Sequence, residues 1–97
     1  MQLYAILRRN GWRTAADLEA AAQRSTATGD EMPDDIRWIR SYVLSESNGS
    51  VGTVCIYQAS SPEKIQEHAQ RAGLPADTIF PVADTVILRA DPVQVAS

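Results

Sequence analysis

Residues 36–59 read IRWIRSYVLSESNGSVGTVCIYQA. The two ends of this stretch are rich in β-branched and aromatic residues, which favour β-strands. The polar segment between them contains Asn48-Gly49, a pair typical of a tight reversal because both residues tolerate positive φ angles. The stretch therefore predicts a hairpin of two long strands, which the rest of the chain must cover or extend.

The two faces of this hairpin differ in composition, because successive side chains of a strand point to opposite faces. One face suits a helix layer and holds Arg37, Ile39, Ser41, Val43, Val54 and Ile56. The other combines aromatic residues with arginine, as contact surfaces do, and holds Trp38, Arg40, Tyr42, Thr53, Cys55 and Tyr57. The alternative, in which Trp38 and Tyr42 are ordinary core residues, stays open. A shift of the strand register by one residue would exchange the two faces.

A strand and a helix are expected before the hairpin. Residues 2–9 alternate between two faces, with Tyr4, Ile6 and Arg8 on one of them, and Asn10-Gly11 should end this strand. Thr14 with an acidic residue three positions later predicts the start of a helix that ends before Gly29. The acidic segment 30–35 contains a proline and reads as a solvated loop, with a carboxylate metal site as the alternative.

A second helix and a last strand are expected after the hairpin. Ser61-Pro62 predicts the start of the helix, and Gly73 predicts its end. Residues 78–89 are again rich in strand-forming residues, and Pro81, which lacks a backbone donor, predicts an edge position or two short pieces. Residues 85–88 are the better strand. The predicted order is β-α-β-β-α-β, the ferredoxin-like α+β sandwich, in which two helices cover one face of a four-stranded antiparallel sheet. Residues 1–92 form this single domain, and residues 93–97 form a flexible tail.

The composition excludes several classes of partner. The net charge of −3 and the absence of a basic run disfavour nucleic acid and membranes as partners. The chain has a single cysteine, Cys55, and no run of signal-peptide or membrane-span character, so we expect a cytoplasmic protein. An outer sheet face with Tyr4, Trp38, Tyr42 and Tyr57 would expose a large apolar patch, which predicts a homodimer.

Three segments resemble the small bacterial family called domain of unknown function 4242. They are the Trp-x-x-Ser-Tyr-Val strand from Trp38, the Cys-x-Tyr strand from Cys55 and the helix exit from Gly73 to Ile79. The resemblance implies a ferredoxin-like dimer and, in some members, nickel held by histidines near the end of the first strand and after the second helix. This sequence has residues 8–10 and Leu74 at those places. Because arginine cannot coordinate nickel, we expect no metal and no cofactor.

The leading hypothesis is a homodimeric small-ligand binding or regulatory protein. An arginine would orient an anionic group and aromatic residues would bury an apolar body. The expected ligand-binding residues are Tyr4, Arg8, Trp38, Arg40, Tyr42, Tyr57 and His68.

Two other hypotheses remain. One is an enzyme like the cofactor-independent dimeric α+β barrel monooxygenases and isomerases, with His68 as the base, or a haem-binding variant in which His68 is the iron ligand. The other is an interaction module without chemistry. Whether the protein is an enzyme stays undecided, and no residue is assigned a catalytic role.

Overall fold

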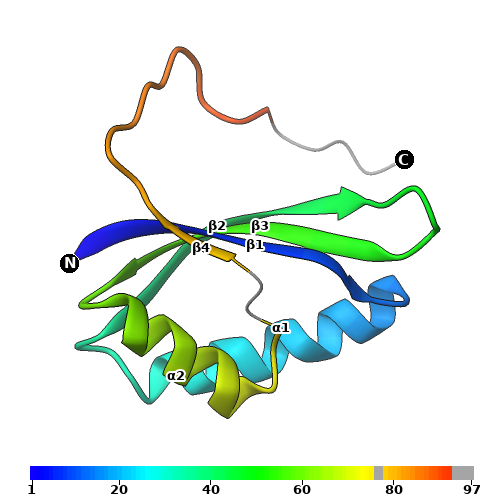
Figure 1. Cartoon of the computed structure of the whole chain (residues 1–97), viewed down its shortest axis with the longest axis horizontal. Coiled ribbons are helices and arrows are strands. Elements are labelled where there is room, and N and C mark those ends of the chain that lie inside the picture. Colours follow the sequence, from blue (N-terminus) through cyan, green and yellow to red (C-terminus); the bar gives the residue numbers. More distant parts are fainter. Residues whose placement is uncertain (76–77, 93–97) are drawn as a thin grey trace.

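The computed structural model describes residues 1–75 and 78–92, and the predicted tail at 93–97 lies outside them. Its elements are β1 (Gln2–Trp12), α1 (Ala15–Asp30), β2 (Ile36–Ser45), β3 (Val51–Ala59), α2 (Pro62–Ala72) and β4 (Thr78–Pro81). All strand pairs are antiparallel and the sheet order is β2-β3-β1-β4. Both helices cover one face of the sheet (Figure 1), which confirms the ferredoxin-like fold. In the part of the chain described, no helix is long and apolar enough to cross a membrane.

The helix boundaries follow the capping residues. The Thr14 side chain accepts a hydrogen bond from the Asp17 N–H at 3.1 Å, and the Ser61 side chain caps α2 in the same way. Gly73 ends α2 in the left-handed conformation, with φ of 70°. α1 runs through Gly29 to Asp30, two residues further than predicted, because one glycine inside a long helix costs too little to stop it.

The turn predictions are correct in part. The β2–β3 hairpin reverses where expected, but only Gly49 has a positive φ, while the Asn48 side chain accepts a hydrogen bond from the Ser50 N–H. Asn10 does have a positive φ, of 52°, yet β1 continues past it to Trp12. The pairing of β1 with β3 shifts register between Arg8 and Trp12, so Asn10 marks an irregularity inside a strand and not its end.

Glu46, in the β2–β3 turn, forms hydrogen bonds to the irregular part of β1. Its buried carboxylate accepts hydrogen bonds from the Arg9 side chain at 2.7–3.1 Å and from the Asn10 N–H at 2.7 Å. Chiefly because of the Arg9 hydrogen bond, the pKa of Glu46 lies below its ordinary value. Glu46 also passes close to Gly52, where an added Cβ would lie 2.7 Å from Oε2 and 2.5 Å from the Arg8 carbonyl oxygen.

A β-bulge in β2 changes which residues face the helices. Trp38 pairs with Tyr57 and Arg40 pairs with Ile56, so Ile39 is an extra residue. Before the bulge, Ile36 and Trp38 point toward the helices. After it, Ser41 points that way and contacts Cys55, whereas Arg40 and Tyr42 bind Asp91 on the opposite face.

The predicted assignment of faces is therefore wrong for most of the sheet. Tyr4, Trp38, Thr53, Cys55 and Tyr57 lie on the helix side, and only Arg40 and Tyr42 lie on the predicted outer face. Beyond Gly52, the buried positions of β3 are its odd-numbered residues from Thr53 to Ala59, which leaves Val54 and Ile56 on the outer face. The physical reason is that large aromatic side chains gain most from burial in the single core. That core consists of Tyr4, Ile6, Met32, Ile36, Cys55, Tyr57, Ala59 and Ile65.

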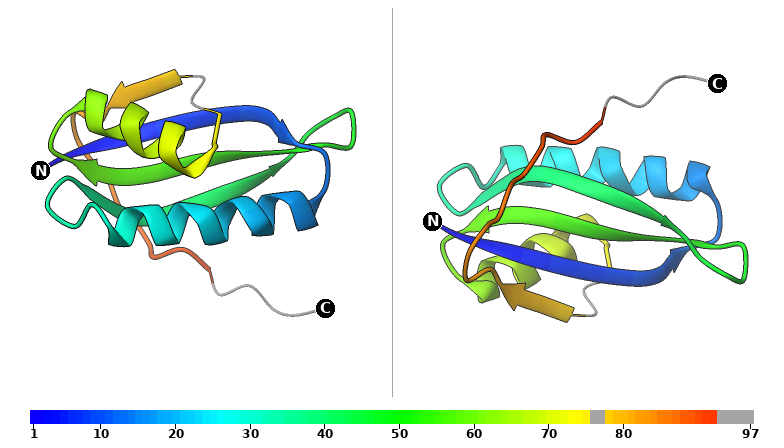
Figure 2. Two further views of the ribbon diagram at one scale, coloured as in Figure 1. Left: turned by 90° about the horizontal axis from the view of Figure 1, so that it is seen from below. Right: turned by 90° about the horizontal axis from the view of Figure 1, so that it is seen from above.

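The last strand is β4, at Thr78–Pro81, and the prediction of a strand at residues 85–88 is wrong. Soon after α2, the chain meets the free edge of β1, and Pro81 is tolerated because it ends an edge strand. The following segment passes over the sheet face opposite the helices (Figure 2). Val86, Ile87 and Leu88 are exposed there, and Asp91 accepts hydrogen bonds from Arg40 and Tyr42.

Candidate functional site

A pocket of about 210 Å³ lies between α1 and the helix-side face of the sheet. β1 contributes Arg8 to its wall, and β3 contributes Tyr57. The other lining residues are Trp12, Leu18, Ala21, Ala22, Ser25, Trp38, Ser41, Val43, Thr53, Cys55 and Leu74. Because α1 presents alanines and one serine here, it leaves room beside the sheet that longer side chains would fill.

Arg8 is the charged residue of this pocket, and its side chain is buried, with 1% exposed. Its Nε–H donates to the carbonyl oxygen of Pro75, in the segment after α2. Its Nη2 is buried and has no hydrogen-bond partner among the residues described. In this part of the chain, no carboxylate lies within ion-pair distance of Arg8. Since an arginine keeps its charge, the pocket contains a buried cation that pairs with no carboxylate among the residues described.

Hydroxyl and thiol groups supply the remaining polarity of the pocket. The hydroxyls of Tyr57 and Ser25 are hydrogen-bonded at 3.0 Å. Burial raises the pKa of Tyr57, so its phenol stays neutral at physiological pH. The Ser41 hydroxyl donates to the Cys55 sulfur at 3.0 Å, and Cys55 in turn contacts Thr53. These groups bond mainly with one another, which leaves Arg8 Nη2 as the buried polar atom of this pocket that has no partner among the residues described.

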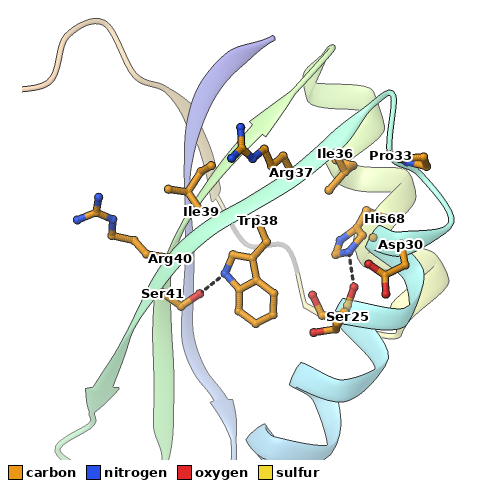
Figure 3. A pocket seen from close by; sticks show the side chains of 12 residues that line it. Ser25, Asp30, Pro33, Ile36, Arg37, Trp38, Ile39, Arg40, Ser41 and His68 are labelled. Atoms are coloured by element: carbon orange, nitrogen blue, oxygen red, sulfur yellow. Dashed lines mark hydrogen bonds between the residues drawn. The ribbon is translucent and has the colours of Figure 1, made fainter. Parts of the chain in front are cut away.

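A second and larger pocket, of about 680 Å³, shares part of its lining with the first one (Figure 3). Most of its lining residues are exposed, so we call it the open pocket, and we call the first one, lined mainly by buried and half-buried residues, the buried pocket. Trp38, Ser25 and Ser41 line both pockets. The Trp38 indole projects from β2 toward α1 and donates from Nε1 to the Ser41 hydroxyl at 2.8 Å. With 38% of its surface exposed, Trp38 forms part of the wall between the buried pocket and the open one.

His68 lines the open pocket from α2. Its Nε2 is hydrogen-bonded to the Ser25 carbonyl at 3.0 Å, its Nδ1 is buried without a partner among the described residues, and its ring meets that of Tyr57 edge-on at 5.5 Å. Burial lowers the pKa of His68, so the imidazole is neutral at physiological pH. The side chain is only 1% exposed. This burial does not favour the haem-ligand or general-base hypothesis.

The structure brings together four of the seven predicted ligand-binding residues. Arg8 and Tyr57 line the buried pocket, His68 lines the open one, and Trp38 lines both. The other three lie elsewhere. Tyr4 is buried in the core and lines neither of these pockets, Tyr42 lies on the outer face, and Arg40 borders the open pocket while its side chain points away from α1 to bind Asp91.

Sequence reasoning missed Ser25, Ser41 and Thr53 as parts of the site. A signal existed for Ser25, because it follows Ala21 by four residues and helical spacing places the two on one face. No comparable signal existed for Ser41, since its orientation depends on the bulge at Ile39. Cys55 is buried, as expected of an inert thiol.

Three comparisons place this chain among known proteins. A family model described as "Nickel responsive protein SCO4226-like" matches residues 4–82. The crystal structure of SCO4226 from Streptomyces coelicolor A3(2) is similar, with a TM-score of 0.66 and 21% identity, over 87% of this chain and 99% of that one. At this identity the likeness shows the shared fold. No protein with a curated description matches the chain.

Proposed function

The chain belongs to the family of SCO4226-like nickel responsive proteins, and we propose that it is a homodimeric protein that binds a small ligand between its sheet and its helices. The resemblance to domain of unknown function 4242 is compatible with this family. Ligand-dependent change in the dimer would give the protein a regulatory role. The observation that carries the proposal is the buried pocket with Arg8 in its wall.

The pocket supports ligand binding because an empty pocket leaves a buried polar group without a hydrogen bond to the described residues, which lowers the stability of the fold. A buried polar group without a hydrogen bond destabilises a fold by about 1–3 kcal/mol, and more when the group is charged. A mostly apolar concave lining with a few polar groups that orient the ligand is typical of small-molecule sites, and this pocket has such a lining. A ligand that pairs with Arg8 would offset the cost and stabilise the native state.

Nickel does not fit the residues of this chain. Among the residues described, no group of three or more histidine, cysteine, aspartate or glutamate side chains is placed to hold a metal ion. The single histidine, His68, bonds its Nε2 to the Ser25 carbonyl, and Arg8 brings a positive charge to the buried pocket. Imidazole and thiolate groups suit nickel, whereas a guanidinium cannot coordinate it. We therefore place the ligand of this chain in another chemical class.

The outer face of the sheet supports the homodimer. Leu3, Leu7 and Ile56 are half-buried on this face, which the described part of the chain covers with the segment after β4 and with no helix, and Tyr42 and Phe80 are exposed beside them. Apolar surface of this kind usually marks a contact, and a second copy of the same chain is the commonest partner of a soluble protein. Ile56→Glu would place a charge in the centre of this face. We expect the wild type to sediment as a dimer and the variant as a folded monomer; a wild-type monomer at micromolar concentration contradicts the homodimer.

Ligand binding is tested by native mass spectrometry of protein purified without metal-affinity resin, compared with the denatured mass. We expect extra mass that is lost on denaturation. The matched variants are Ala22→Phe, which fills the buried pocket, and Ala20→Phe, two residues away on the exposed side of α1. Ala22→Phe should abolish the extra mass and Ala20→Phe should retain it. Equal retention in both variants would place the ligand outside this pocket.

A further inference from the structure

We propose, on the basis of the proposed function, that the buried pocket takes a small organic monoanion: a flat, largely apolar carboxylate whose carboxylate group pairs with the Arg8 guanidinium. The inference begins with the fixed position of that guanidinium. Arg8 lies at the start of the β1 irregularity and its Nε–H is held by the Pro75 carbonyl oxygen. One hydrogen-bonding edge of the side chain is thus occupied, while Nη2 remains without a partner among the described residues.

The charge of the pocket selects an anion. An arginine side chain in a protein carries a positive charge. Burial raises the pKa of Tyr57 and lowers that of His68, so neither brings a charge near Arg8. A buried positive charge with neutral neighbours is best satisfied by a negative charge, and a carboxylate matches the planar guanidinium in geometry.

A single cation favours a singly charged ligand. Transfer of phosphate into the pocket would bring close to two negative charges to one arginine, and its oxygens would need more donors than the pocket offers. The nearby hydroxyls of Ser25 and Tyr57 already bond to each other, and the Ser41 hydroxyl already accepts from the Trp38 indole N–H. A carboxylate needs fewer partners, and Arg8 supplies the charged one.

The size and lining of the pocket select a compact, flat body. A volume of about 210 Å³ exceeds the ~150 Å³ of a cavity that binds benzene, so one ring with a small substituent fits. The wall opposite Arg8 is formed by the small and aliphatic residues Leu18, Ala21 and Ala22 of α1. Trp38 and Tyr57 add the faces and edges of two stacked rings. Benzoate is therefore a suitable probe.

The test compares sodium benzoate with benzamide, a neutral molecule of nearly the same shape, and with inorganic phosphate. Binding is followed by titration of the amide and indole N–H signals of Ser25 and Trp38 in NMR spectra of the wild-type chain. We expect benzoate to bind at least tenfold more tightly than benzamide, and phosphate to leave both signals unchanged. This comparison needs no variant and so does not depend on the folding of one.

Two arginine variants test whether the preference for benzoate over benzamide depends on Arg8. Arg8→Met removes the charge from the pocket. Arg24→Met is the control, because Arg24 also donates from Nε to a carbonyl oxygen near the end of α2, that of Ala72, but does not line the pocket. We expect Arg8→Met to abolish the preference for benzoate over benzamide and Arg24→Met to retain it.

The other outcomes separate the two proposals. Equal binding of benzoate and benzamide overturns the assignment of an anion and leaves the proposed ligand site in place. Preferential binding of phosphate also overturns the carboxylate. If neither benzoate nor benzamide shifts Ser25 or Trp38 at millimolar concentration, the inference and the proposed ligand site both fail.

Discussion

The indole of Trp38 stacks on the phenol ring of Tyr57, with ring centroids 5.9 Å apart and ring planes at 11°. The two residues are directly paired across β2 and β3, on the helix side of the sheet. The pair therefore joins the exposed edge of the site to its buried interior. Because Trp38 lines both pockets, the pair lies where the two pockets meet.

Replacement of Trp38 should both destabilise the fold and open the buried pocket. Because 38% of Trp38 is exposed, we expect Trp38→Ala to lower the free energy of unfolding by about 1–3 kcal/mol, less than for a fully buried tryptophan. Trp38→Phe keeps a stacked ring and should lower the free energy of unfolding by less than half as much. Chemical denaturation measures the free energy of unfolding of both variants. Equal losses for the two variants would show that stacking on Tyr57 contributes nothing.

Gly52 should tolerate no side chain. An added Cβ would lie 2.5 Å from the Arg8 carbonyl oxygen, a backbone atom that cannot move freely. We expect Gly52→Ala to destabilise by about 1–3 kcal/mol or more, as overpacked cores do. Gly29→Ala is the control, since its Cβ would meet only the His68 ring at 3.8 Å and alanine favours the helix, so it should be neutral or stabilising.

Stability should fall in mild acid because of His68. The pKa of His68 is below its ordinary value of 6.5 in the folded protein, so below pH 6.5 the unfolded chain binds a proton that the folded protein excludes. The contribution of His68 is complete above pH 6.5 and decreases as the pH falls toward the folded-state pKa. We expect melting temperatures of the wild type to drop between pH 7 and pH 5.5. His68→Gln retains a donor for the Ser25 carbonyl and should flatten this part of the profile; an unchanged slope would contradict the assignment to His68.

Two tyrosines test the difference between a buried and an exposed hydrogen bond. Tyr57→Phe removes the hydroxyl bonded to Ser25 inside the core and should cost about 1 kcal/mol. Tyr42→Phe removes the hydroxyl bonded to Asp91 in solvent and should change stability by less than about 0.5 kcal/mol. Urea denaturation of both variants measures the two losses in the free energy of unfolding. A larger loss for Tyr42→Phe would mean that the contact of Asp91 with the outer face is structurally important.

The predictability of the site differs from residue to residue. The structure brings Arg8, Trp38, Tyr57 and His68 to the two adjoining pockets, and residue type alone predicts them, because large aromatic and charged side chains are informative wherever they lie. Their surroundings were not predictable. The expected pocket lay between two subunits on the outer face, whereas these residues lie between the sheet and the helices.

Local signals in the sequence determined the order of the elements, the caps at Thr14, Ser61 and Gly73, and the position of the central hairpin. Such signals act within a few residues, so they survive without knowledge of the fold. Only the tertiary structure decided which side of the sheet was buried, because the bulge at Ile39 and the pairing of β1 with β3 join residues far apart in the chain. That no carboxylate in the described part of the chain pairs with Arg8 likewise results from packing, since the sequence alone does not say which acidic residues lie near it.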